Sequence, residues 1–214
     1  MRWTLAIIGC LALVALAVYL GVWASPASRE GGQAYRLIYL HLPLAVNTLV
    51  AFTVAAAASL LVLLRRGAAA DRWARAAMSA ALLLGTAMLA SGMLWAWLAW
   101  GHWWDFKSPR LLLALVLWIL IIVYSLLRGG LPEGARQQKV AAVYCLIAWL
   151  DVPLVYLSTR LVGTDIHPAS VVLDDPLMKL ALATAFAAAT AVGALLLAAF
   201  LRRTRTAERP TPDA

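Results

Sequence analysis

The chain has 214 residues, of which 64% are hydrophobic and only 13% are charged. A soluble domain has roughly half apolar and about a quarter charged residues, so this composition excludes an ordinary soluble protein and predicts an integral membrane protein. The formal net charge is +8. Because the basic residues lie at the ends of apolar runs, this charge indicates membrane topology and not nucleic-acid binding.

Six apolar runs follow one another, and each is long enough to span a bilayer at about 1.5 Å per helical residue. They predict an all-α integral membrane protein with six transmembrane helices in a single domain, residues 1–214. The first run resembles a signal peptide only weakly, because its apolar stretch exceeds the usual ~7 to 15 residues, so we expect a retained anchor. The runs lie at about 5–23, 37–64, 76–100, 111–127, 140–157 and 177–201.

Most basic residues lie in alternate loops and at the two ends of the chain. Since cytoplasmic segments are enriched in Lys and Arg, this bias predicts that both the N- and the C-terminus are cytoplasmic. Residues from about 202 would form a cytoplasmic tail. The loops at 25–36, 101–110 and 158–175 would face the outside, and the histidines at this face would be His41, His102 and His167.

Five of the ten tryptophans fall within ten residues at the end of the third run. Anchoring at a membrane surface needs only one or two such rings per helix end. If the segment stays helical, Trp97, Trp100 and Trp104 share one face and form a platform. This segment, about 95–110, therefore predicts a shelf for a large, flat, apolar ligand, built from Trp95, Trp97, Trp100, Trp103 and Trp104.

Imidazole is the commonest metal ligand in proteins, and two histidines from different elements can bind the iron of a porphyrin from opposite sides. His41 lies about one turn inside the outer end of the second run, and His167 lies in the last outer loop. An isolated histidine in either place is more often structural. Together with the tryptophans, the pair predicts a bis-histidine haem site. Cys10 and Cys145 lack metal-ligand spacing and are expected to be buried hydrophobes.

Three stretches resemble motifs of the tryptophan-rich "WWD" haem-handling proteins of cytochrome c maturation. Tyr39-Leu40-His41-Leu42-Pro43-Leu44-Ala45 resembles the start of their second span, and Trp100-Gly101-His102-Trp103-Trp104 resembles their signature. The stretch from Val152 to His167 resembles the approach to their second histidine. Size and layout are similar to the short members of the family. The chain departs from the pattern at Phe106, Lys107 and Pro168.

The resemblance implies that His41 and His167 are axial ligands of haem b (iron protoporphyrin IX) held at the periplasmic face of a bacterial inner membrane. The tryptophan segment would grip the edge of the ring until a membrane-tethered haem chaperone takes it. Similar proteins work beside ABC transporter subunits and a small single-span membrane protein. We expect this chain to be a haem carrier rather than a turnover enzyme. No nucleic-acid partner is expected.

Outer basic residues offer partners for the two haem propionates, because Arg pairs well with carboxylates. The candidates are Arg36, Arg110 and Arg160, and each could equally be an interfacial cation whose charged end reaches water. His102 is expected to line the site, to bond a carboxylate or to act as a spare ligand. Asp151 is an ionisable group at membrane depth, which makes it either functional or structurally bonded.

Three other functions remain open from the sequence. A b-type cytochrome would move electrons across the membrane, but such proteins generally need redox centres at both depths, and the cytoplasmic half of this chain has no histidine. A transporter with an aromatic gate would be expected to have internal repeats or broken helices. A haem lyase component is the nearest enzymatic alternative.

Overall fold

The computed structural model describes residues 1–29, 31–64, 67–161, 167 and 171–207, of which 159–161 and 205–207 are described by their backbone alone. Within these residues the regular structure is helical, apart from an isolated bridge between Ser28 and Gly32. Two short helical turns, Leu20–Ala24 and Ala34–Leu37, accompany the longer helices. These are α1 (Arg2–Tyr19), α2 (Ile38–Leu63), α3 (Gly67–Trp100), α4 (Pro109–Gly129), α5 (Ala135–Ala148), α6 (Asp151–Leu161) and α7 (Pro176–Ala207).

The predicted all-α membrane fold is confirmed, since six stretches of the described chain are long and apolar enough to span a bilayer. The third starts at Gly67, well before the predicted position 76. The first part of α3 is charged and was not recognised as helical, but its Asp71 pairs with Arg128 at the end of α4. The six stretches are Arg2–Ala24, Ala34–Leu63, Gly67–Trp100, Pro109–Gly129, Ala135–Ser158 and Pro176–Thr204.

The fifth span is two helices, whereas the sequence predicted one continuous run. The chain breaks between α5 and α6, where the Val152 amide bonds the Trp149 carbonyl at 2.9 Å, a tighter pairing than an α-helix makes. Pro153 has no N–H to donate, and it is tolerated in the first turn of a new helix that begins at Asp151. The Asp151 side chain is 6% exposed, and its Oδ2 has no hydrogen-bond partner within the described chain.

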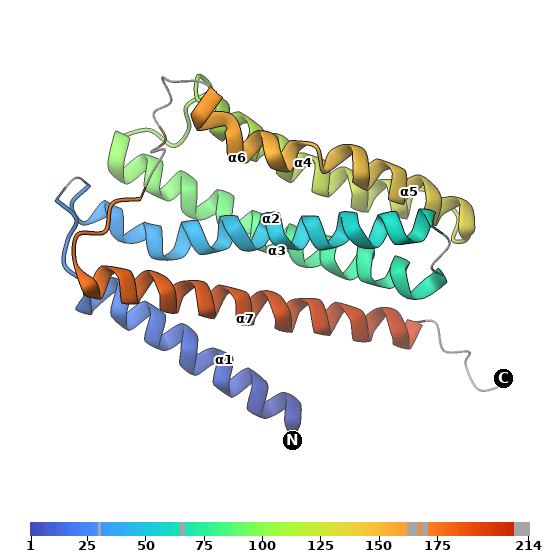
Figure 1. The fold of residues 1–214 in the computed structure, drawn as a ribbon, viewed down its shortest axis with the longest axis horizontal. Helices are drawn as coiled ribbons and strands as arrows, with labels where there is room; N and C mark the ends of the chain where they lie inside the picture. Colours follow the sequence, from blue (N-terminus) through green and yellow to red (C-terminus); the bar gives the residue numbers. More distant parts are fainter. Residues whose placement is uncertain (30, 65–66, 162–166, 168–170, 208–214) are drawn as a thin grey trace.

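The helices form layers in which α2 and α3 lie together between α4, α5 and α6 on one side and α1 and α7 on the other (Figure 1). Small residues allow α2 and α3 to approach closely, and Ala55, Ala56, Ala77 and Ala81 are all buried. The ends of α1, α3 and α6 and the starts of α2, α4 and α7 gather at one end of the bundle (left in Figure 1). Which compartment this end faces stays a prediction.

A buried ion pair ties three helix ends together at the opposite end of the bundle. Arg128 donates to both carboxylate oxygens of Asp71, at 2.7 and 2.8 Å, and the two side chains are only 10% and 7% exposed. Gln137 Nε2 donates to the carbonyls of Arg128 and Leu131 at 2.7 and 3.0 Å. From the sequence, basic residues at the ends of apolar runs, such as Arg128, have only a role in topology. The structure adds a bidentate contact that joins the start of α3 to the end of α4, and the Gln137 bonds attach the start of α5 to it.

Replacing Asp71 with Ala should lower the free energy of unfolding by about 3–5 kcal/mol, because Arg128 would be left buried without its carboxylate. Thermal unfolding in detergent micelles measures the change. The double variant Asp71→Leu with Arg128→Met should recover much of the loss, since no unpaired charge remains. Equal midpoints for wild type and Asp71→Ala would show that the ion pair does not hold these helix ends together.

Candidate functional site

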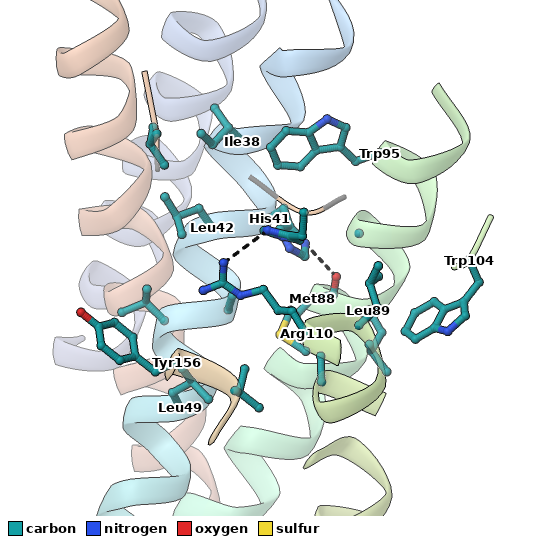
Figure 2. A pocket seen from close by; sticks show the side chains of 18 of the residues that line it. Ile38, His41, Leu42, Leu49, Met88, Leu89, Trp95, Trp104, Arg110 and Tyr156 are labelled. Atoms are coloured by element: carbon teal, nitrogen blue, oxygen red, sulfur yellow. Dashed lines mark hydrogen bonds between the residues drawn. The ribbon is translucent and has the colours of Figure 1, made fainter. Parts of the chain in front are cut away.

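A cavity of about 250 Å³ lies at the end of the bundle where the loops gather. Its walls come from α2, α3, α4 and α6, together with His167 and Val171, and they are mainly apolar. His41, Trp95 and Arg110 point into this space from α2, α3 and α4 (Figure 2). An apolar cavity with a few convergent polar groups is the usual form of a small-molecule site.

The two histidines paired from the sequence lie next to each other in this cavity. The ring centroids of His41 and His167 are 6.3 Å apart, and the planes are inclined at 45°. Two imidazole nitrogens bound to one metal ion at about 2 Å each are about 4 Å apart, with the ring centres somewhat further apart. The separation of the rings therefore suits two ligands on opposite sides of a single ion.

His41 is held against α3 by the hydrogen bonds that its Nδ1 atom makes. Nδ1 lies 3.1 Å from the Met88 carbonyl oxygen and 3.3 Å from Ser91 Oγ, and Ser91 Oγ itself donates to the Met88 carbonyl at 2.9 Å. The carbonyl has no hydrogen, and the only hydroxyl hydrogen of Ser91 is already used, so Nδ1 must be the donor. The Nε2 atom of a neutral His41 therefore keeps its lone pair free for a ligand, as in most metal-binding histidines.

Gly92 provides the space that the His41 ring occupies. A Cβ atom at position 92 would lie 2.8 Å from Cε1 and 3.2 Å from Nδ1 of His41. Trp95 meets the same ring edge to face, with centroids 5.8 Å apart, and Tyr35 meets Trp95 at 5.9 Å. The ring is thus fixed by contacts from α3 on several sides, which restricts its rotation.

Arg110 enters the cavity because α4 begins next to it. Ser108 accepts a hydrogen bond from the Leu111 amide at 3.3 Å, and Pro109 occupies the first helical position, which is the favoured way to start a helix. Arg110 therefore lies in the first turn of α4. Its Nη1 is 3.3 Å from Nδ1 of His167, and because a guanidinium can only donate, the imidazole nitrogen accepts.

The predicted tryptophan platform is wrong as a single helical face. The helix α3 ends at Trp100, and Gly101 follows in the left-handed conformation with φ 77°. The Gly101 amide closes the last turn on the Trp97 carbonyl at 3.0 Å. Trp104 lies beyond this reversal, so it no longer shares a helix face with Trp97 and Trp100.

The five tryptophans instead divide into two groups. Trp95 and Trp104 line the cavity. Trp97 and Trp103 stack with centroids 5.2 Å apart and planes 8° apart, and they remain 46% and 51% exposed outside it. Trp100 is also absent from the cavity wall and lies near the exposed His102, at 6.2 Å between ring centroids.

A second hollow of about 450 Å³ adjoins the cavity between α3 and α4 and shares Leu89 and Trp104 with it. Its other walls are almost wholly apolar. The Trp104 indole Nε1 is buried and has no hydrogen-bond partner within the described residues. Trp104 thus separates the histidine cavity from an apolar space beside it.

Other residues proposed from the sequence lie elsewhere. Arg36 donates to the Ser25 carbonyl at 2.9 Å and does not line the cavity. The side chain of Arg160 lies outside the described residues, although its backbone belongs to α6. His102 is exposed, and Asp151 is buried at the break between α5 and α6 and is not part of the cavity wall.

Sequence reasoning missed the group on α3 that holds His41. Met88, Ser91 and Gly92 lie inside a long apolar run whose composition predicts a span and nothing more. The available signal was a Ser-Gly pair one turn before Trp95. A polar residue followed by the smallest residue in an apolar helix indicates that another side chain approaches closely at that point.

Comparison with known proteins relates this chain to one family. A family model described as "Heme exporter protein C" matches residues 1–210. A cytochrome c biosynthesis ccmC-like mitochondrial protein of Marchantia polymorpha is 28% identical over 79% of this chain and 72% of its own length. The heme exporter protein C of Rhodobacter capsulatus is 28% identical over 59% of this chain and 52% of its own length. The Escherichia coli K12 protein of that name is 26% identical over 74% of this chain and 65% of its own length.

Replacing Gly92 with Ala should displace the His41 ring, because the added methyl carbon would overlap Cε1. The imidazole signals of His41 in the NMR spectrum of the histidine-labelled protein should move, while those of His102 stay in place. Gly9→Ala is the matched control, since a Cβ there meets no atom within 4 Å. Unmoved His41 signals in Gly92→Ala would mean that Gly92 does not position the ring.

Proposed function

This chain belongs to the heme exporter protein C family, and we propose that it binds haem b and passes it to a membrane-tethered chaperone during c-type cytochrome maturation. The observation that carries this proposal is the meeting of His41 and His167, from distant parts of the chain, in one mainly apolar cavity. This combination suits an iron porphyrin, because imidazole nitrogens can bind the metal and apolar walls can contact the ring.

The residues of the cavity match the different parts of a haem molecule. His41 and His167 would supply one nitrogen ligand each, and the Arg110 guanidinium could bind a propionate through two parallel hydrogen bonds. The cavity, at about 250 Å³, is smaller than the ~300 to 1,000 Å³ typical of ligand sites. Part of the porphyrin would therefore extend past Trp104 into the adjoining apolar hollow or out of the bundle end.

The two groups of tryptophans take different tasks in this proposal. Trp95 and Trp104 contact the bound ring, since both line the cavity. The stacked Trp97 and Trp103, about half exposed at the same end of the bundle, offer a flat apolar surface to an incoming chaperone. Large aromatic side chains commonly dominate the binding energy of such contacts.

The need to release haem favours a binding site at the end of the bundle. Haem can leave through the loops without separation of the spans, because connecting segments open more easily than packed helices. We place the protein in the bacterial inner membrane with this end toward the periplasm, and beside ABC transporter subunits and a small single-span protein. The exporter name of the related proteins supports such a complex. No step in this function requires turnover chemistry by the chain itself.

The other functions have less support. A b-type cytochrome that carries electrons across the membrane would need a second haem near the opposite end, and the chain holds only three histidines. Two of them are used in the cavity, and the third, His102, lies in the loop at the same end. A single haem at one end suits collection and delivery better than transmembrane electron transfer.

His41→Ala and His167→Ala should each convert bound haem from a six-coordinate low-spin to a high-spin absorbance spectrum. Each should lower haem affinity by more than ~tenfold, because loss of even the outer partners of metal ligands costs about 10- to 100-fold. The double variant should retain no specific haem. His102→Ala is the matched control and should keep the wild-type spectrum. An unchanged spectrum in the double variant would refute the assignment of both ligands.

Trp104→Ala should weaken haem retention by about tenfold, as expected when an aromatic contact of more than 1 kcal/mol is lost. Trp97→Ala should leave retention near the wild-type level and slow delivery to the chaperone. The rate of haem transfer to excess apomyoglobin measures retention, and the rate of transfer to the purified chaperone measures delivery. Equal dissociation rates for the two variants would contradict the division of the tryptophans into two groups.

A further inference from the structure

The two histidines of the cavity differ in what their Nδ1 atoms do. Nδ1 of His41 donates to the Met88 carbonyl, as the hydrogen-bond partners require. Nδ1 of His167 accepts from Arg110 at 3.3 Å. A neutral imidazole has one protonated and one unprotonated nitrogen, so the two rings hold opposite tautomers.

Only one of these tautomers is ready to bind iron through Nε2. His41 presents an unprotonated Nε2, whereas His167 carries its hydrogen on Nε2 as long as Nδ1 accepts from Arg110. A nitrogen must be unprotonated to bind a metal. If the hydrogen of His167 moved to Nδ1, two N–H donors, one from His167 and one from Arg110, would face each other. If His167 instead bound through Nδ1, the iron would occupy the place of the guanidinium. In both cases Arg110 has to move first.

The cargo itself carries a group that can move Arg110. A guanidinium binds a carboxylate through two charge-assisted hydrogen bonds, which are roughly twice as strong as a bond to a neutral acceptor. Haem has two propionates, and Arg110 lies in the first turn of α4 with its long side chain in the cavity. A propionate that reaches the cavity would therefore compete successfully with the imidazole for Arg110.

We propose that Arg110 makes haem binding sequential, so that iron first binds His41 and gains His167 as its second ligand only after a propionate has drawn Arg110 away. The step rests on the proposed haem-binding function and adds an order and a specificity to it. His167 loses the Nε2 proton to water and takes one from water on Nδ1, so its charge is unchanged, and Nε2 then forms the coordinate bond. Departure of the propionate reverses the exchange and withdraws the second ligand.

The first test examines the haem-free protein. The full-length chain in lipid nanodiscs, with ¹⁵N-labelled histidine, gives only three sets of ring signals. Long-range ¹H–¹⁵N correlation should identify His41 as the Nδ1–H tautomer and His167 as the Nε2–H tautomer. In Arg110→Leu, His167 should gain the Nδ1–H form while His41 is unchanged. A wild-type His167 already in the Nδ1–H form would overturn the proposal.

The second test compares ferric haem with its dimethyl ester, which lacks the propionate charges. Wild-type protein should give a six-coordinate low-spin spectrum with haem and a high-spin spectrum with the ester, bound through His41 alone. Arg110→Leu should give a low-spin spectrum with the ester and bind it at least ~tenfold more tightly than wild type does, because it gains a second ligand. Lys107→Leu is the matched control, since it removes an exposed charge from the neighbouring loop.

The outcomes separate the two proposals. A low-spin spectrum for both cargoes in the wild-type protein would overturn the role of Arg110 and leave the bis-histidine site intact. The same conclusion would follow if Arg110→Leu remained high-spin with the ester. Absence of any spectral response to His41→Ala and His167→Ala would instead overturn the haem site itself.

Discussion

The hydrogen bond from His41 to the Met88 carbonyl is the contact on which the site depends. An imidazole inside an apolar helix bundle is costly unless its polar atoms are paired. The bond satisfies one nitrogen, fixes the tautomer and leaves the other nitrogen without a hydrogen. It requires that α2 and α3 approach closely, which the buried alanines between them allow. The chemistry of the site therefore follows from the packing of two helices.

Polar interactions at the two ends of the bundle are linked by the helices between them. Helix α3 carries Asp71 near its start and the group that holds His41 near its end, and α4 carries Arg110 at its start and Arg128 at its end. The ion pair between Asp71 and Arg128 fixes α3 and α4 relative to each other at one end. At the other end the same two helices place Trp95 and Arg110 around the cavity. A buried ion pair contributes little net stability by itself, and its value here is in setting the position of helices.

The sequence predicted the six spans because long apolar runs are nearly sufficient evidence for membrane helices. It also paired His41 with His167, and the structure brings their rings together. The predictions from the sequence failed where local backbone conformation or contacts between helices determine the structure. The left-handed Gly101 ends α3 and divides the tryptophans. A new helix that begins at Asp151, with Pro153 in its first turn, interrupts the fifth run, and the carbonyl of Met88 has no signature in an amino-acid sequence. Arg110 was one of three equivalent candidates, and only the start of α4 singles it out.

The reversal of the chain at Gly101 separates two regions with different tolerance to changes in length. Between Gly92 and Trp95 the chain is helical, and one residue inserted there would turn everything beyond it by about 100° around the axis, carrying the indole of Trp95 off the imidazole. Between Trp104 and the start of α4 an inserted residue would lengthen the connection without rotating α3. Natural variation in the length of this segment should therefore accumulate on the far side of the glycine.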